Sequence, residues 1–258
     1  MGFSPHTVTF DCWQTLIYES QARGLAIERA ELFARFVGVA PERVQVALSA
    51  AWREHQRAWH RRVVFAGPEM TDHTLEALGL TLSAQRRAAL IERLESEILK
   101  REVIAIDGSR ELLETLRAAG VRTALICDTG FTPGRVVRQL LARVALLELL
   151  EVQIFSDEVR FPKPHLRPFS AALEALSACA QGAVHVGDLR RSDVAGARAA
   201  GMGTVRFRGR NDDNDAGPGG ANAGVLDCAA AGCEPICARP EADIVVSTYG
   251  ELALRLSS

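Results

Sequence analysis

The stretch Val8–Ile17, VTFDCWQTLI, decides the fold. Its apolar, β-rich start predicts a buried strand that delivers Asp11 into a turn, and Thr15 follows four residues later. A carboxylate at the end of a strand is either a simple turn former or a group placed for chemistry. Two positions after Asp11 stands Trp13, where a second carboxylate would have supported the chemical interpretation. The rest of the chain has to decide between the two.

Composition excludes several classes of protein. The chain has 258 residues, 48% of them hydrophobic and 24% charged, so it is long enough to bury a substantial core. With 30 basic and 32 acidic residues, the balance of charge favours neither a nucleic-acid partner nor a membrane surface. No apolar run is long enough to predict a membrane span, and the N-terminus does not read as a secretory signal. Six scattered cysteines predict reduced thiols in a cytoplasmic protein.

Short apolar runs alternate with helical patterns over most of the chain. This alternation predicts an α/β fold with a Rossmann-like parallel sheet covered on both faces. In such a sheet the carboxyl ends of the strands share one edge, where ligands bind. The runs are residues 7–10, 123–127, 152–155, 183–186, 204–207 and 243–246.

Residues 18–101 contain helical patterns only. We therefore predict an all-helical cap domain at 18–101, inserted after the first strand of a core domain made of residues 1–17 and 102–258. Within the core, residues 208–240 are rich in Gly and Asn and predict a long loop. Its cysteines, spaced C-x₄-C-x₃-C, lack a fourth ligand for zinc and favour incidental thiols, leaving their role open. They are Cys228, Cys233 and Cys237.

Four polar stretches at predicted strand ends fit together as a phosphate-handling site. A carboxylate can attack phosphorus and divide one difficult hydrolysis into two easier steps. Mg²⁺, held by carboxylates, offsets the repulsion between that nucleophile and a phosphate, and a lysine adds a further positive charge. Hydroxyl and backbone donors then hold the transferring group. The stretches contain Asp11, then Cys127, Asp128 and Thr129, then Lys163 between two prolines, then Asp188 and Asp193.

The order and spacing of these motifs resemble the haloacid dehalogenase superfamily of aspartate-nucleophile hydrolases. Asp11 and Thr15 match the first motif, D-x-D-x-[TV], and Lys163–Pro164 matches its lysine motif. Asp188 and Asp193 match the motif GDxxxxD. The resemblance covers nearly the whole chain apart from the Gly/Asn-rich loop. It implies a Rossmann-like core with a helical cap inserted after the first motif.

The resemblance also implies a role for each residue. Asp11 is the expected nucleophile, and Mg²⁺ would be held by Asp11, the Trp13 carbonyl and Asp188, with Asp193 orienting the metal shell. Lys163 would neutralise Asp11 and phosphate, while Thr129 and the Cys127–Asp128 backbone would hold the phosphoryl group. The expected substrate is a small phosphorylated, anionic metabolite. The remaining substrate contacts are assigned to Trp13, Thr15, Asp128 and His55. A homodimer is compatible with the sequence, which does not determine the oligomeric state.

Departures from the family pattern leave three functions open. Family phosphatases usually carry a second Asp at the place of Trp13, which serves as acid and base, and indole cannot replace it. Gln14 stands where a Gly is usual, and Cys127 where a Ser or Thr is usual. Family dehalogenases also lack the second Asp and use no metal, so a metal-independent 2-haloacid dehalogenase is the first alternative. The acidic pair Asp188 and Asp193 favours the Mg²⁺-dependent phosphohydrolase. A degenerate member that binds a ligand or partner without turnover is the second alternative.

One predicted helix, around residues 50–65, has two interpretations. Trp52, His55 and Trp59 recur at helical spacing and predict an apolar stripe packed within the cap. Alternatively, His55 points to the site, where it binds an anionic substrate or replaces the missing acid.

Overall fold

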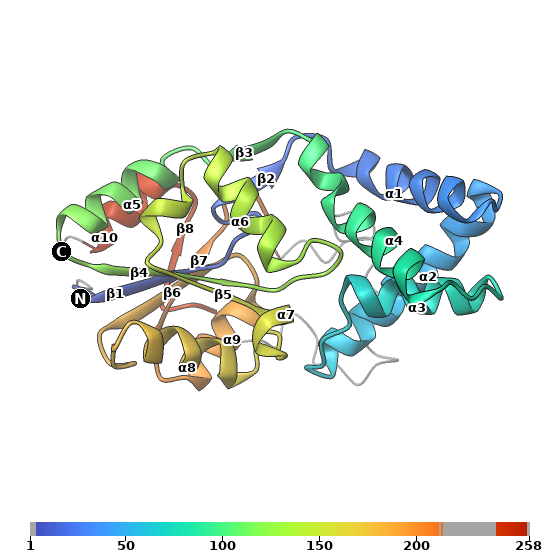
Figure 1. The fold of residues 1–258 in the computed structure, drawn as a ribbon. Helices are drawn as coiled ribbons and strands as arrows, with labels where there is room; N and C mark the ends of the chain where they lie inside the picture. Colours follow the sequence, from blue (N-terminus) through green and yellow to red (C-terminus); the bar gives the residue numbers. More distant parts are fainter. Residues whose placement is uncertain (1–3, 212, 214–240, 257–258) are drawn as a thin grey trace.

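Six parallel strands form the central sheet. The computed structural model describes residues 4–211, 213 and 241–256. Its strand order is β5-β4-β1-β6-β7-β8, all pairs being parallel, which confirms the predicted fold class (Figure 1). All six predicted runs are strands of this sheet: β1 (Thr7–Phe10), β4 (Arg122–Cys127), β5 (Val152–Phe155), β6 (Ala183–Gly187), β7 (Gly203–Phe207) and β8 (Ile244–Val246).

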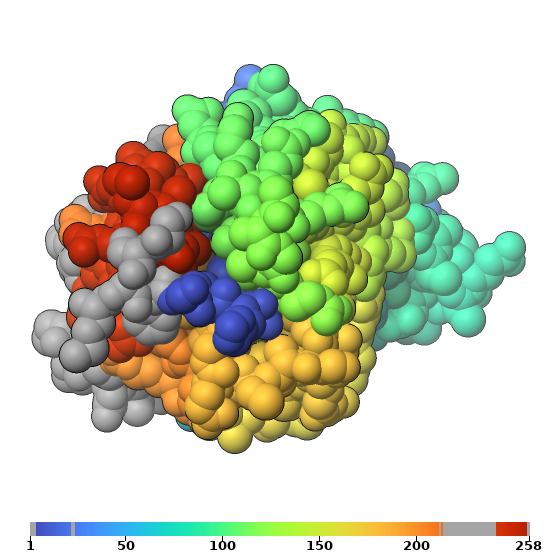
Figure 2. Space-filling model, turned by 90° about the vertical axis from the view of Figure 1, so that its left-hand side faces the viewer, coloured from blue at the N-terminus to red at the C-terminus, as the bar shows by residue number. Residues whose placement is uncertain are grey.

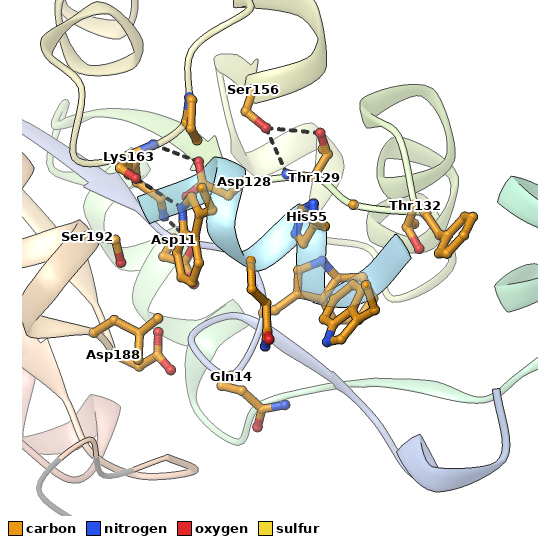
Figure 3. A pocket seen from close by; sticks show the side chains of 18 of the residues that line it. Asp11, Gln14, His55, Asp128, Thr129, Thr132, Ser156, Lys163, Asp188 and Ser192 are labelled. Atoms are coloured by element: carbon orange, nitrogen blue, oxygen red, sulfur yellow. Dashed lines mark hydrogen bonds and ion pairs between the residues drawn. The ribbon is translucent and has the colours of Figure 1, made fainter. Parts of the chain in front are cut away.

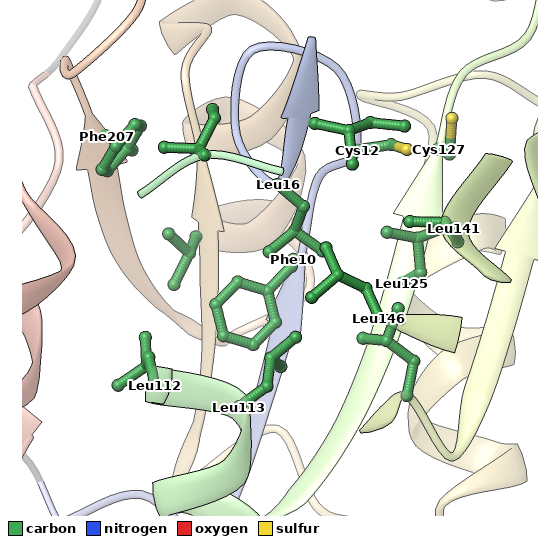
Figure 4. Packing of buried hydrophobic residues seen from close by; sticks show 14 of the residues in the cluster. Phe10, Cys12, Leu16, Leu112, Leu113, Leu125, Cys127, Leu141, Leu146 and Phe207 are labelled. Carbon is green, nitrogen blue, oxygen red and sulfur yellow. The ribbon is translucent and has the colours of Figure 1, made fainter. Parts of the chain in front are cut away.

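Helices cover both faces of the sheet. On one face lie α5 (Ser109–Ala118), α6 (Gly134–Arg143) and α10 (Tyr249–Leu256), and on the other α8 (Leu166–Ala175) and α9 (Ala195–Ala199) (Figure 1). Successive strand residues point to opposite faces, so Leu125 joins the cluster around Phe10 and Leu113 (Figure 4), whereas Ile126 packs with Phe169. Because the sheet is buried on both faces, packing fixes the positions of its strand ends.

A helical segment, residues 22–100, lies beyond the carboxyl ends of the strands (Figure 1). It comprises α1 (Ala22–Val37), α2 (Pro41–His60), α3 (Gly67–Ala77), α4 (Ala84–Ser96) and the 3₁₀ turn η1 (Glu97–Lys100). It has a hydrophobic cluster of its own, built around Phe33, Met70 and Leu90. Helix α3 begins at Gly67–Pro68, because proline in the first turn of a helix loses no hydrogen bond and favours a helix start.

The helical segment is joined to the sheet through a two-stranded antiparallel ribbon. Strand β2 (Ile17–Glu19) leads into the segment and β3 (Val103–Ala105) leads out of it, with Ile17 opposite Ala105. The predicted domain limits fall at this ribbon, and the division into core and cap stays a prediction. From the edge opposite the helical segment, the sheet and its helices form a rounded body, behind which the segment projects to one side (Figure 2).

Three short turns complete the described chain: η2 (Leu147–Leu149), α7 (Ser156–Val159) and the π-helical turn η3 (Arg190–Val194). Of the predicted 208–240 loop, only residues 208–211 and 213 are described. The remainder, with Cys228, Cys233 and Cys237, lies outside the described residues. Within the described ranges, no helix combines the length and apolar character that crossing a membrane requires.

Candidate active site

Four neighbouring strands each end in polar side chains that reach one cavity. Asp11 follows β1, Asp128 and Thr129 follow β4, Ser156 follows β5 and Asp188 follows β6. Parallel strands place these positions at the same edge of the sheet. Together with residues of the helical segment they line a cavity of about 1060 Å³ (Figure 3).

Lys163 is the central charge of this site. Its Nζ donates hydrogen bonds to Asp11 Oδ1 at 2.5 Å, to Asp193 Oδ1 at 2.7 Å and to the Ile126 carbonyl at 3.0 Å. Burial alone lowers the pKa of an ammonium group, but the Asp11 and Asp193 carboxylates outweigh it, so the pKa of Lys163 is raised well above its usual value. A fully charged lysine is therefore held against the expected nucleophile.

Asp193 is saturated by hydrogen bonds from protein donors. Besides Lys163, His185 Nε2 lies 3.2 Å from Oδ1, and Leu189 N and Ser192 Oγ donate to Oδ2 at 3.0 and 3.2 Å. Burial raises the pKa of this carboxyl, but the Lys163 charge prevails and holds the pKa well below its usual value. Asp193 thus positions Lys163 and the turn after β6. This role differs from direct binding of a metal.

His185 supports Asp193 from inside the sheet, and sequence reasoning missed it. Burial lowers the pKa of His185, so the ring is neutral. The Asp193 carboxylate only accepts, hence Nε2 carries the proton and Nδ1 accepts from Thr9 Oγ1 at 2.8 Å. Gly187 permits this approach, because a Cβ there would lie 2.3 Å from Asp193 Cγ. The sequence signal was a histidine inside an otherwise apolar strand.

Asp11 and Asp188 carry negative charge that the protein only partly compensates. Burial raises the pKa of Asp11 to about 6 despite Lys163. Burial, followed by the Asp11 and Asp193 charges, raises the pKa of Asp188 well above its usual value. Asn211 Nδ2 donates to Asp188 Oδ2 at 2.7 Å, and no described side chain bonds the second oxygen of either carboxylate.

This pair of carboxylates fits a divalent cation. In the described part of the chain, no three His, Cys, Asp or Glu side chains are gathered as a metal site. Mg²⁺ typically takes one or two carboxylates and completes its shell with water and substrate oxygens. Asp11 and Asp188 supply that minimum, with Trp13 also lining the cavity, and a cation there would compensate the charge of both buried carboxylates.

Asp128 connects the site to the helical segment. Its Oδ1 accepts from Lys163 N at 2.9 Å, and its Oδ2 accepts from Trp59 Nε1 at 2.9 Å. Trp59 Nε1 also lies 3.0 Å from the Lys163 carbonyl, and the Arg191 guanidinium lies 3.7 Å from the centre of the Trp59 ring. Burial raises the pKa of Asp128 to about 6. Trp59 was predicted to be part of an apolar stripe. Its indole N–H in fact bonds Asp128 and the Lys163 carbonyl, and so joins α2 to the loop after β4 and to the segment around Lys163.

Thr129 lies in the cavity wall together with Ser156, a residue that sequence reasoning missed. Thr129 N donates to Ser156 Oγ at 2.9 Å, and the two hydroxyl oxygens are 3.0 Å apart. Thr129 Oγ1 also accepts from Asp157 N at 3.2 Å. The predicted hydroxyl donor, Thr129, is thus paired with Ser156. The sequence signal for Ser156 was its position directly after a predicted strand.

Two predicted site residues lie away from the cavity. Cys127 points into the hydrophobic cluster beside Cys12 (Figure 4), because alternation along β4 turns its side chain into that face of the sheet. A hydrogen bond with Cys12, and burial, raise the pKa of the Cys127 thiol. Thr15 is fully buried, and its Oγ1 bonds no described residue. Neither lines the cavity, so the structure does not support direct substrate contact by either side chain.

Trp13 and His55 do line the cavity. Gln14, beside Trp13, has φ +63°, the left-handed conformation that explains why glycine is the favoured residue here. His55 Nδ1 lies 2.6 Å from the Phe65 carbonyl, and the ring stacks on Trp52 with centroids 4.8 Å apart. Burial lowers the pKa of His55, so the ring is neutral with Nε2 as an acceptor. A neutral ring adds no positive charge for an anion.

The chain belongs to the haloacid dehalogenase-like hydrolases, whose family model matches residues 5–201. The chain is therefore a hydrolase, and its site is the group of polar side chains that meet at the strand ends.

Among curated proteins, it is 37% identical over 105 residues to glyceraldehyde 3-phosphate phosphatase of Pyrococcus abyssi, a match that covers 40% of this chain and 42% of that protein. Phosphoglycolate phosphatase of Colwellia psychrerythraea is 31% identical over 104 residues, covering 40% and 44%. The chain thus spans less than half the length of these relatives.

Solved structures share the fold over nearly the whole chain. A HAD phosphatase from Thermococcus onnurineus has a TM-score of 0.61 at 21% identity, with 97% of both chains covered. L-2-haloacid dehalogenase from Xanthobacter autotrophicus has a TM-score of 0.60 at 18% identity, with 98% of this chain and 99% of that chain covered. Both reactions thus occur on this fold.

Proposed function

We propose that this protein is a Mg²⁺-dependent phosphohydrolase that acts on a small phosphorylated metabolite. The observation that carries the proposal is the pairing of Asp11 with a buried, charged Lys163, beside a second carboxylate, Asp188, with an oxygen left for a cation. The relatives named as phosphatases of small phosphorylated compounds support it. We place this activity in the cytoplasm, in keeping with the cysteine usage.

Asp11 would attack the phosphorus atom and form an aspartyl-phosphate, while the P–O bond to the substrate breaks and its alkoxide leaves. In the second step, water would attack the aspartyl-phosphate, release phosphate and regenerate Asp11. Lys163 keeps Asp11 ionised and compensates the added charge of the transferring group. Thr129, Ser156 and the backbone after β4 line the same cavity and would bind the phosphoryl oxygens. Mg²⁺, held by Asp11, Asp188 and the Trp13 carbonyl, would neutralise phosphate charge when bound.

Trp13 restricts the range of substrates. No carboxylate stands where family phosphatases carry their acid, so the leaving oxygen departs without a proton from that position. His55 is neutral and accepts at Nε2, which suits it to receive a proton from water in the second step. We therefore expect esters with good leaving groups to be hydrolysed faster than simple alkyl phosphates.

Phosphate release from a panel of phosphate esters tests the proposal, with Mg²⁺ or with a chelator. Asp11→Asn should lower the rate about 10⁴-fold or more, because the nucleophile is removed. The matched control is Asp72→Asn, which should retain the rate. Asp72 is an exposed residue of α3 that pairs with Arg87. Chelation should abolish the wild-type activity, and added Mg²⁺ should restore it.

The aromatic side chain of Trp13 favours one rival, a metal-independent 2-haloacid dehalogenase. That reaction gains nothing from a second buried carboxylate with a raised pKa, such as Asp188. Halide release from 2-haloacids in the presence of a chelator would establish the rival. Tight binding of phosphate analogues with no turnover on either panel would instead establish a non-catalytic, ligand-binding protein.

A further inference from the structure

Arg29, in helix α1, places a positive charge in the cavity wall apart from Lys163. Its Nε donates to the Leu94 carbonyl at 3.0 Å, and its Nη2 donates to Thr132 Oγ1 at 3.2 Å. Figure 3 shows Thr132 at the side of the cavity away from Asp11 and Lys163, with His55 between them. Arg29 therefore lies at the opposite end of the cavity from the expected nucleophile.

Arg29 has no carboxylate partner among the described residues, although three acidic residues act on it electrostatically. These acids are each paired with another cation: Glu19 with Arg101 at 2.8 Å, Glu95 with Arg135 at 2.6 Å and Glu97 with Lys100 at 2.8 Å. Burial lowers the pKa of Arg29 to about 10, so the group remains charged at neutral pH. Arg29 is thus a charged group that forms no direct ion pair with a described carboxylate, although the acids around it act on it from a distance.

The donors of Arg29 are only partly used. A guanidinium group has five N–H donors, and the two hydrogen bonds to Leu94 and Thr132 both go to neutral oxygens. Hydrogen bonds from a guanidinium group to an anion are stronger than those to neutral oxygens. The planar fork matches carboxylate and phosphate oxygens and can bond two of them at once. The remaining N–H donors of Arg29 are therefore suited to bind an anion at this end of the cavity.

We propose that Arg29 binds a second anionic group of the substrate, a carboxylate or a second phosphate, and so selects substrates with an anion at each end. The inference rests on the proposed function, in which the first anion is the phosphoryl group at Asp11. The alternative is that Arg29 only fastens α1 to α4 and to the loop after β4. The two differ in whether ligand preference depends on the guanidinium.

Calorimetric titration with non-hydrolysable phosphonates in Mg²⁺ buffer separates them. 3-Phosphonopropionate carries a phosphonate and a carboxylate, propylphosphonate lacks the carboxylate, and propane-1,3-diyl bisphosphonate supplies a second phosphonate. Homologues with one to three further methylenes cover the span of the cavity. We expect the wild type to bind the best two-anion ligand about 10- to 100-fold tighter than propylphosphonate. The preferred second group identifies carboxylate or phosphate as the ligand class.

Variants assign the preference to Arg29. Arg29→Met should abolish it while leaving the affinity for propylphosphonate unchanged, and Arg29→Lys should keep part of it. Arg35→Met, which removes an exposed charge from the same helix, is the matched control and should keep all of it. Circular dichroism confirms that each variant is folded.

A wild type without preference at any chain length, or an Arg29→Met variant that keeps the preference, overturns the inference. Because these titrations require no turnover, the inference can fail or hold independently of the hydrolysis assay. Absence of turnover combined with an Arg29-dependent preference would overturn the proposed function alone.

Discussion

The two ends of the cavity differ in how their charges are compensated. At the Asp11 end, one lysine bonds two carboxylates, and His185 and backbone groups complete the bonding of Asp193. At the other end, Arg29 bonds only neutral oxygens. The comparison shows that the chain's own groups fix Lys163 and Asp193, whereas Asp188 at one end and the Arg29 guanidinium at the other keep bonding capacity for a ligand.

The origin of the two ends explains this contrast. The reactive residues follow strands of a sheet that is buried on both faces, so their positions are fixed by packing. Arg29 comes from the helical segment, which has a separate hydrophobic cluster and reaches the sheet through a two-stranded ribbon. The two ends are therefore positioned by different hydrophobic clusters, and the Trp59 indole N–H of the segment joins them by bonding Asp128.

Breaking the compensated end should have the largest effect on stability. Lys163→Met leaves Asp11 and Asp193 buried without their cation, which should lower the free energy of unfolding by about 3–5 kcal/mol. Urea denaturation measures this loss. Lys100→Met, which removes a lysine that is 70% exposed from its pair with Glu97, should cost less than about 1 kcal/mol. Equal losses in the two variants would contradict the proposed compensation.

The contact between the helical segment and the strand-end residues can be tested at Trp59. Trp59→Phe keeps an aromatic ring under Arg191 but removes the N–H that bonds Asp128 and the Lys163 carbonyl. We expect the free energy of unfolding to fall by about 1–2 kcal/mol, because the acceptor is charged. Trp52→Phe, which alters a half-exposed tryptophan on the same helix, should change it by less than about 0.5 kcal/mol. A smaller loss at Trp59 than at Trp52 would show that the indole bond is dispensable.

A pH dependence of stability is expected from Asp128. Its pKa in the folded protein is raised to about 6, above the unfolded value of 3.8, so between these values the folded state binds more proton than the unfolded state. Stability should therefore fall as pH rises through this window and level off above it. Urea denaturation of wild type and Asp128→Asn at pH 4.5 and 7 checks the sign: the wild type should lose stability relative to the variant. A relative gain would refute the raised pKa.

Sequence patterns predicted every strand of the large sheet and most of the polar residues at its edge, but not Ser156. They succeeded because short apolar runs and the polar residues that follow them are local signals. The side chain of Cys127 could not be oriented from sequence, since the face it occupies depends on how β4 packs. Likewise, the contacts of Arg29 and Trp59 join residues about 70 to 100 positions apart, and no spacing rule reports them.

The ribbon formed by β2 and β3 has a consequence for engineering. Its register sets Glu19 opposite Val103, so the chain leaves and re-enters the sheet domain at paired positions, about 5 Å apart between Cα atoms. Any folded insert with adjacent termini satisfies that geometry. A foreign helical module grafted between these two residues would thus meet the sheet at the same positions, and it would have to supply a donor to Asp128 in place of the Trp59 N–H.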